Sequence, residues 1–547
     1  MQDGPKILGA DGSPLTPRPS RAAALVSGGR TPYDAADRTS DHMAEWNPYL
    51  GSADGDLNMY RDTIVARVRD MVRNDGWASG AVTRILDNVI GGNFRPIFKP
   101  DYAALRAQTG NTGFDHVWAD EFGAALEASY RTWSNDVGRW CDTQRRLTMP
   151  QQMRLAFRHK VVDGDALAML HWLPERIAPG RARYATALQI IDPDRLSNPQ
   201  VQYDQNAMRG GVVVDSYGAA QGYYVRRAHQ GDFYSAADSV TWDYIARETE
   251  WGRPIVVHDF DQERAGQHRG GGGIFAPVLQ RMKMLVRYDG AELDASILNA
   301  IFAAYIESPF DHSMISEAMG SDSDDAPDIG QYQKDRNEFH QDARLRINGA
   351  RMPILFPGEK INAVTAARPN SNFKDFEGAV LRNCASAFGI SAQQLSNDWS
   401  DVNYSSARGA LLEAWKTLHR RRQDFAIGFG QPILCAFVEE AMEVDNLPLP
   451  AGAPAFMDHR AAYARAKWMG PGKGIIDPVK ERQGAVLGMD AGLGTLEDEA
   501  ADINGVDWRE VLHQRSIEVK RFKELGLPLP KWAVGADPDD AMKEPGP

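Results

Sequence analysis

Apolar residues at helical spacing characterise the part of the chain that follows its first 58 residues. Ile64, Val68 and Met71 lie on one face of a helix, which Asn74, Asp75 and Gly76 separate from the next helix. Residues 1–58 are rich in Gly, Pro, Ser, Ala and Asp without such spacing, and we expect an extended or partly disordered arm there. The spacing predicts helices over about 60–74, 77–89, 120–133 and 149–162.

After these helices the spacing of apolar residues changes from a helical to a strand-like period. Short alternating or β-branched runs are separated by Gly, Pro and Asp turns, which is typical of antiparallel strands. The expected strands are 166–173, 186–191, 211–214, 222–226 and 255–260. Together with the preceding helices they predict an α+β unit.

The second half of the chain is mostly helical. Four glycines at 270–273 predict a flexible hinge, and 274–306 can run as one helix about 50 Å long with Pro277 in its first turn. An acidic, low-complexity segment follows it. We then expect helices over 372–388 and 406–444, the latter interrupted at 428–432, and a helical C-terminal part over 457–525.

Composition narrows the class of protein. The formal net charge of −13 argues against tight wrapping of a phosphate backbone, which depends on clustered Lys and Arg. The three cysteines, Cys141, Cys384 and Cys435, lie far apart and are expected to be reduced core residues. Without a basic and apolar leader or a run of roughly 18 apolar residues, the sequence predicts a soluble intracellular protein with no membrane span.

Two glycine-containing stretches do not meet the requirements of a phosphate cradle. Ile274 and Phe275 stand where a P-loop needs Lys and Ser or Thr, and a turn is the better interpretation of 470–474, because Ile475 follows Lys473 and its glycines. No Gly-x-Ser-x-Gly, His-Glu-x-x-His or Walker pair is present in the sequence. We therefore expect no enzymatic activity and no cofactor.

Two groups of polar residues remain as weak candidates for chemistry. His258, Asp259 and Asp261 lie at a strand end but alternate faces, which does not favour a metal site. Asp163 and Asp165 suit either an acid/base pair or a turn around Gly164, and the turn is far commoner. We expect no metal.

A polar stretch and a basic cluster favour contact rather than catalysis. Residues 391–402 form a loop rich in Gln, Asn, Asp and Ser that passes directly into a long helix through Asn403, Tyr404, Ser405, Ser406, Ala407 and Arg408. Arg420, Arg421 and Arg422 lie within that helix. They suit a solvated or inter-subunit face, or contact with nucleic acid or a partner.

Six stretches in order resemble the lambda-family portal proteins of tailed phages. They are 67–74 (RVRDMVRN) with Gly76, Trp77, Ala78, Gly80 and 88–91 (NVIG); 191–196 (IDPDRL); 258–260 (HDF) leading to 266–270 (GQHRG); 403–408 (NYSSAR); Trp468 with 476–481 (IDPVKE); and 505–508 (GVDW). The resemblance covers roughly residues 40–530. The glycines at 271–273 are more than the family pattern leads us to expect.

The resemblance implies an α+β, mostly α, portal fold that assembles as a ring, usually of twelve subunits, around an axial channel. Its regions would be an arm (1–58), wing (59–273), stem helix (274–307), clip (308–367), returning stem helix (368–390), tunnel loop (391–405), kinked helix (406–445), crown (446–530) and flexible tail (531–547). Double-stranded DNA would enter through the channel, driven by a separate terminase motor, and leave by the same route. The portal itself would have no catalysis.

The resemblance also assigns contact residues and partners. The tunnel loop would face DNA, although Trp399 suits packing against a neighbouring loop equally well. The clip would bind the terminase large subunit and later the head-tail adaptor. The ring would contact the major capsid protein or scaffold. The location would be the portal vertex of the virion, after assembly in the host cytoplasm. Alternatives are a head or tail protein without DNA passage, or a packaging nuclease or NTPase. The expected DNA-facing residues are Gln393, Gln394, Asn397, Asp398, Trp399, Asp401, Asn403 and Tyr404; the clip residues are Glu317, Asp322, Asp324, Asp325 and Asp328; and the inter-subunit or DNA contacts are Arg408, Arg420, Arg421 and Arg422.

Overall fold

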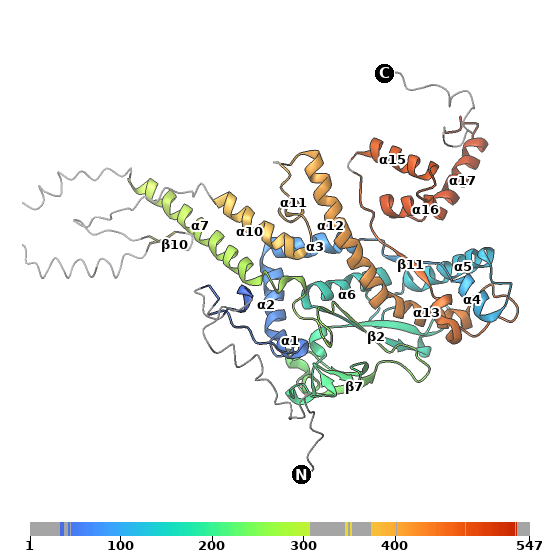
Figure 1. The fold of residues 1–547 in the computed structure, drawn as a ribbon, viewed down its shortest axis with the longest axis horizontal. Helices are drawn as coiled ribbons and strands as arrows, with labels where there is room; N and C mark the ends of the chain where they lie inside the picture. The colour runs from blue at the N-terminus through green and yellow to red at the C-terminus, as the bar shows by residue number, and fades with distance from the viewer. Residues whose placement is uncertain are drawn as a thin grey trace, which may run out of the picture.

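The computed structural model describes residues 33–37, 42–43, 45–306, 338, 345–347, 350–352, 373–400, 402–475, 477–530 and 532. It has a mixed body of helices and sheets, from which two helices, α7 and α10, extend to one side (Figure 1). A group of C-terminal helices lies at the far end of the body from them. The fold is therefore α+β and mostly helical, as the sequence predicted.

The helices of the body begin and end where the sequence provides caps. The side chain of Asp75 accepts a hydrogen bond from the backbone N–H of Ala78, so the chain leaves one helix and starts the next at this residue. Gly164, with φ of 91°, ends α6 in the left-handed region. The helices are α1 (Ala53–Leu57), α2 (Arg61–Asn74), α3 (Gly76–Val89), α4 (Tyr102–Thr109), α5 (His116–Ser134) and α6 (Met149–Asp163).

Two antiparallel sheets follow, and the predicted strands are confirmed. The first sheet has the order β3-β2-β8, with β2 (Asp165–Trp172) between β3 (Thr186–Ile191) and β8 (Val256–Phe260). The second has the order β4-β5-β6-β7. Its strands are β4 (Met208–Arg209), β5 (Val212–Val214), β6 (Ala220–Arg226) and β7 (Trp242–Ala246), of which β4 and β7 were not predicted.

A third pair of strands joins an N-terminal segment of the body to a C-terminal one. Strand β1 (Arg95–Phe98) pairs antiparallel with β11 (Ala466–Met469), with Arg95 opposite Met469. Phe94 stacks on Trp468 beside this pair, at 5.0 Å between ring centroids. This pairing makes the C-terminal part continuous with the main hydrophobic core.

The glycines at 270–273 are not a flexible hinge. A Cβ atom at Gly270 would collide with the carbonyl oxygen of Gly164, and one at Gly273 with the carbonyl oxygen of Val161. The run is a tightly packed crossing over the end of α6, where only glycine leaves room for the backbone to approach. Gly272 and Gly273 have φ of 70° and 51°, and α7 does not begin at residue 274 as expected but at Leu279. A 3-10 turn (Gly273–Phe275) comes first.

Helices α7 (Leu279–Ile306) and α10 (Phe373–Phe388) form an antiparallel pair that leads away from the body (Figure 1). The 28 residues of α7 span about 42 Å. Pro277 precedes α7 rather than lying in its first turn. The only strands described in the segment between the two helices are β9 (Leu345–Ile347) and β10 (Ala350–Met352), which pair antiparallel.

The long helix after the polar stretch is continuous. Helix α12 (Tyr404–Phe425) passes through a π-helical turn, η9 (Ala426–Gly430), into α13 (Gln431–Val444), so the expected interruption is a local widening of one helix. By length and composition Tyr404–Val444 could cross a membrane, with a mean hydropathy of 1.2 in its most apolar window, but 61% of that window is buried within the chain. Core helices of folded domains meet the same criteria.

The C-terminal helices are α14 (Arg460–Tyr463), α15 (Pro478–Asp490), α16 (Leu496–Glu499) and α17 (Trp508–Glu524), with a π-helical turn, η11 (Ala500–Asn504), before α17. Cys141 and Cys384 are buried, Cys435 is half-buried, and all three are free thiols, as predicted. Short 3-10 helices lie at Asp34–Ala36, Pro174–Arg176, Pro193–Arg195, Pro199–Val201, Phe233–Ser235, Asp238–Val240 and Phe456–His459.

Candidate functional site

The polar stretch between α10 and α12 is partly helical, which corrects the expectation of one continuous loop. Helix α11 (Ala392–Ser396) begins at a capping box, in which the Ser391 hydroxyl accepts from the N–H of Gln394 and the Gln394 amide oxygen accepts from the N–H of Ser391. Gln393 and Gln394 are half-buried. The Gln394 side chain is thus used in a helix cap, and the Ser-x-x-Gln sequence was the missed signal for it.

The remainder of this stretch lies on the surface. Asn397, with φ of 56°, ends α11, and the carboxylate of Asp398 accepts from the backbone and hydroxyl of Ser400. These hydrogen bonds lower the pKa of Asp398, so it is an anion at neutral pH. Trp399 and Tyr404 are partly exposed, at 38% and 43%.

Asn403 has a local role as well as an exposed position. Its side-chain oxygen accepts from the N–H of Ser406 and caps α12. The predicted DNA-facing residues that the structure describes therefore divide into an exposed set and the two half-buried glutamines within α11. Residue Asp401 and the clip residues Glu317, Asp322, Asp324, Asp325 and Asp328 lie outside the described residues, so their roles stay predictions.

The three consecutive arginines on α12 do not form one basic surface. Arg420 is exposed and pairs with Asp424 at 3.0 Å, whereas Arg421 is half-buried and donates to the carbonyl oxygen of Phe388 at 2.7 Å. Arg422 is buried and donates to three backbone carbonyls. Burial lowers the pKa of Arg422 to about 10, which still leaves it charged at neutral pH. The prediction of a shared contact role for all three is wrong for Arg422.

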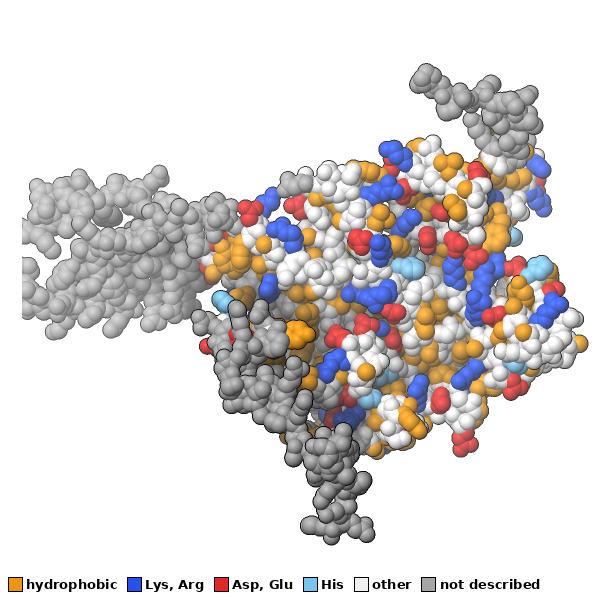
Figure 2. Space-filling view, viewed as in Figure 1, with side chains coloured by type: hydrophobic (Ala, Val, Ile, Leu, Met, Phe, Trp, Pro, Cys, Tyr) orange, Lys and Arg blue, Asp and Glu red, His pale blue; other side chains and the backbone are white. Residues whose placement is uncertain are grey.

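Arg408 remains a candidate contact residue. It is exposed on the first turns of α12 and lines a cleft of about 270 Å³ together with Gln394, Trp415, Lys473 and Lys480. The wider surface carries no single sign of charge. Figure 2 shows Lys and Arg interspersed with Asp and Glu on one face, and hydrophobic side chains gathered where α7 and α10 leave the body.

The strongest electrostatic feature of the described residues is a buried network around Asp165, the first residue of β2. One oxygen of Asp165 accepts from Arg61 at 3.1 Å and Arg269 at 2.8 Å, and the other accepts from the backbone N–H of Gly270 at 2.6 Å. Burial alone would raise the pKa of Asp165, but Arg269, Arg61 and the His258 hydrogen bond hold it well below its usual range. Asp165 is a structural anion directly after the turn at Gly164, so the turn interpretation is confirmed and the acid/base pair is not supported.

Further N–H groups of the two guanidinium groups donate to backbone carbonyl oxygens. Arg61 donates to the carbonyl oxygen of Gly270, and Arg269 donates to those of Pro193, Leu196 and Gly210. Burial lowers the pKa of His258 although Asp165 lies 3.1 Å from its ring nitrogen, so this imidazole is neutral at neutral pH. The network fixes α2, β2 and the glycine crossing to one another.

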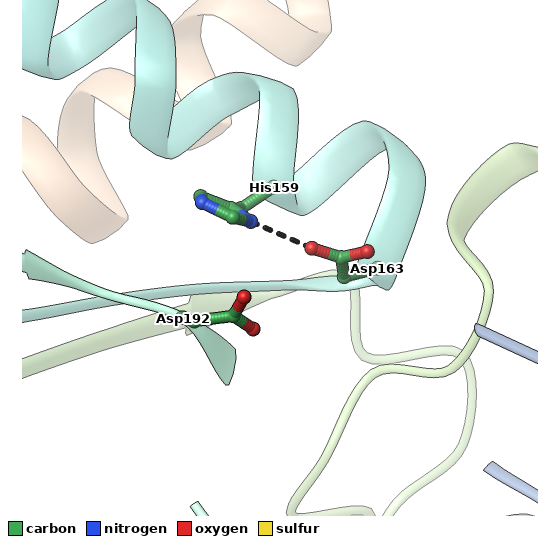
Figure 3. A group of neighbouring side chains, drawn as sticks. All are labelled: His159, Asp163 and Asp192. Atoms are coloured by element: carbon green, nitrogen blue, oxygen red, sulfur yellow. Dashed lines mark hydrogen bonds and ion pairs between the residues drawn. The ribbon is translucent and has the colours of Figure 1, made fainter. Parts of the chain in front are cut away.

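A neighbouring group of His and Asp side chains has the composition of a metal site. His159, Asp163 and Asp192 point toward one another from α6 and the end of β3 (Figure 3). Arg69 already provides the cation there, with 2.7 Å to Asp163, 2.8 Å to Asp192 and 2.7 Å to Asp194. The guanidinium bridges the three carboxylates and offsets part of their charge, so the group acts as an ion-pair cluster.

The trio that the sequence offered as metal ligands is also divided among other partners. His258 bonds to Asp165, while Lys160 lies 2.8 Å from Asp259 and 3.0 Å from Asp261. Burial raises the pKa of Asp259 to about 6 despite the attraction of Lys160. These contacts assign the trio to packing between α6 and β8.

Comparison with known proteins gives one family. Residues 39–422 match the family described as "Phage portal protein, lambda family". The chain is 31% identical over 494 residues to the portal protein of Escherichia phage N15, covering 90% of each chain. It is 30% identical over 541 residues to portal protein B of Escherichia phage lambda, covering 97% of this chain and 95% of that one.

Solved structures give a weaker likeness. A chain of the virion of the native gene transfer agent particle matches at 15% identity and a TM-score of 0.29, covering 77% of this chain and 98% of that one. A chain of the neck of the native gene transfer agent particle computed with C12 symmetry has a TM-score of 0.27, with 14% identity and the same coverages. The assignment rests instead on the sequence matches, which extend over most of the chain: it belongs to the lambda family of phage portal proteins.

Proposed function

We propose that copies of this portal protein form a dodecameric ring at one capsid vertex, and that double-stranded DNA passes through its axial channel during packaging and ejection. The family makes the chain a portal protein of the phage head-tail connector. The observation that carries the ring is the pair α7 and α10, which leads away from the body with no domain of the described chain to cover it (Figure 1).

The inner face of this pair is packed and its outer face is not. Met282 and Leu285 on α7, and Leu381 and Cys384 on α10, are buried. Met284, Leu293, Ile297 and Phe376 each have at least half of their surface exposed. Apolar side chains on several sides of a helical pair are stabilised when identical neighbours pack around an axis, because such a head-to-tail contact closes into a ring.

Purified full-length protein is therefore expected to give closed rings with an axial hole in averaged negative-stain images. The physical reason is that ring closure removes the outer apolar faces of α7 and α10 from water. A Met284→Lys and Leu293→Lys variant is expected to shift the protein toward smaller species on size-exclusion chromatography. As a control, Val137→Lys changes an apolar residue on the α5–α6 loop, which is 98% exposed, and should leave the rings intact. A monodisperse monomer at high concentration would overturn the proposal.

DNA would meet the exposed part of the stretch between α11 and α12. Asn397, Asp398 and Trp399 offer replaceable hydrogen bonds and one aromatic face, and the net charge of −13 limits adhesion of a moving polyanion. Asp401 and the acidic clip residues fit the same scheme. The clip would bind the terminase large subunit and then the head-tail adaptor, and the ring would contact the major capsid protein or scaffold.

Replacing 397–400 with a Gly-Ser sequence of equal length is expected to leave rings intact and to abolish most DNA packaging, because the channel loses its DNA-facing side chains. The change leaves the capping box of α11 and the Asn403 cap of α12 untouched. Packaged DNA per particle is the measurement, with Val137→Ser as the control substitution. Normal packaging by the variant would favour the alternative, a head or tail protein without DNA passage.

We further propose that the protein performs no catalysis. The residues that the sequence offered as an acid/base pair or metal ligands are engaged by Arg61, Arg69, Arg269 and Lys160. A nuclease or NTPase would need a set of such groups facing a substrate. The energy for packaging would come from the terminase.

A further inference from the structure

Three large apolar side chains lie in solvent just before α1. Trp46, Tyr49 and Leu50 are 68%, 89% and 92% exposed, in a segment (46–50) without helix or strand structure. Single exposed apolar residues are common on protein surfaces, but three within five residues of an extended segment are typical of a sequence that docks elsewhere. We call 46–50 the arm segment.

The residues that follow the arm segment are firmly held, contrary to the expectation of a loose arm up to residue 58. The carboxylate of Asp54 is buried and accepts from the backbone N–H of His268 at 2.9 Å, and its other oxygen lies 2.7 Å from the His268 ring. Arg264 donates to the carbonyl oxygen of Gly51 and to Asp56, both at 2.8 Å. The arm segment therefore emerges from a fixed point on the 264–268 loop.

The same loop forms one wall of a cleft of about 660 Å³. Gln267 and His268 line it on one side, and the π-helical turn η9 and the start of α13 line it on the other. Its lining is mixed: Val256, Phe260, Ile427, Pro432 and Cys435 supply apolar surface, and the polar and charged groups include Arg247, Glu248, His258, Gln262, Gln431 and Arg460. This composition suits an extended peptide with large apolar side chains.

Ile427 shows that the cleft lacks a cover. It is 67% exposed, although its helix neighbours Ala426 and Phe429 are fully buried. The extra residue of a π-helical turn leaves this side chain on the cleft side of an otherwise buried helix. A partner that covers Ile427 would remove a large apolar surface from water.

We propose that in the ring the arm segment of one copy docks into this cleft of a neighbouring copy. The proposal rests on the ring stated under Proposed function. A segment that fitted its own cleft would fold back without the entropic cost of association, yet its side chains lie in solvent while its root lies on the rim of that cleft. Each copy then inserts its arm segment into one neighbour and binds the arm segment of the other neighbour in its own cleft. Such a head-to-tail interface can close into a ring.

Disulfide trapping tests this docking directly. The variant combines Tyr49→Cys and Ile427→Cys, with Cys435→Ala to remove the one native thiol that lines the cleft; Cys141 and Cys384 are buried and stay in place. Both new cysteines replace exposed residues, so the fold is preserved. After mild oxidation of the assembled full-length protein, we expect a ladder of covalent multimers on a non-reducing denaturing gel. Moving the second cysteine to Val137 should give no ladder.

The other outcomes are each decisive. A monomer band without free engineered thiols means that the arm segment occupies its own cleft, and this overturns docking between copies. A monomer band with both engineered thiols free overturns docking in this cleft altogether. Rings of the reduced protein are imaged separately, so rings without a ladder refute only the docking, whereas absence of rings refutes the proposed function.

Discussion

Replacing Asp165 with asparagine is expected to lower the free energy of unfolding by about 3–5 kcal/mol, because the change leaves two buried arginines without their counter-charge. Asp165 is fully buried, and Arg61 and Arg269 are each nearly so. Asparagine keeps the shape and one acceptor oxygen. The loss therefore reports the missing charge rather than a cavity.

Urea unfolding followed by circular dichroism at one fixed protein concentration measures this change, since assembly also affects apparent stability. Asp243→Asn is the matched control. Asp243 also pairs with an arginine, Arg227 at 2.8 Å, but both side chains are about half exposed, and no measurable shift of the midpoint is expected. A shift for Asp165→Asn as small as that of the control would contradict the assigned role of the network.

The effect of Asp165→Asn also depends on pH in a defined direction. The pKa of Asp165 is depressed in the folded protein, so its stabilising effect is complete above the unfolded value of about 3.9 and is lost as the pH falls below it. The variant has no carboxyl group at this position to protonate. The difference in stability between the two proteins should therefore be constant near neutral pH and shrink below about pH 4.

Local signals in the sequence were sufficient for most helices and strands of the body. Asp75 caps the start of α3 and Gly164 caps the end of α6. The alternation of apolar and polar residues in the strands is visible within a few residues. The pairing of β1 with β11 was not predictable in this way. Its partners, such as Arg95 and Met469, lie hundreds of residues apart, so neither carries a local sign of the other.

The candidate site was predicted less well than the fold, for a related reason. The sequence correctly predicted that Asn397, Asp398 and Trp399 are exposed, because polar composition indicates exposure, while their contact with DNA stays a prediction. It could not tell glycines that permit close approach, as at Gly270 and Gly273, from glycines that permit motion. The sequence also carried no sign that a charged residue could be buried. Asp165 is buried because its partners, Arg61 and Arg269, come from distant segments of the chain.

The arginines of α12 provide the sharpest test of that distinction, and Arg422→Met is expected to lower the free energy of unfolding by about 3 kcal/mol. Arg422 donates to the carbonyl oxygens of Asn88 at 2.8 Å and Val89 at 2.9 Å, at the C-terminal end of α3, and to that of Pro471 at 2.8 Å. A positive charge at a helix C-terminus is favourable, and methionine satisfies none of these carbonyls.

Arg420→Met is the matched control two residues away on the same helix. Arg420 is exposed and its pair with Asp424 contributes about 0.5 kcal/mol or less, so the urea midpoint should hardly move. Because Arg422 ties α3 and α12 to the segment before α15, its loss should also expose 470–475 to limited proteolysis, while the control stays resistant. Equal behaviour of the two variants would mean that the three arginines act alike, as their sequence suggested. A large effect confined to Arg422 means instead that the last turn of α12 holds the C-terminal helices to the body, while Arg408 and Arg420 stay exposed on the same helix.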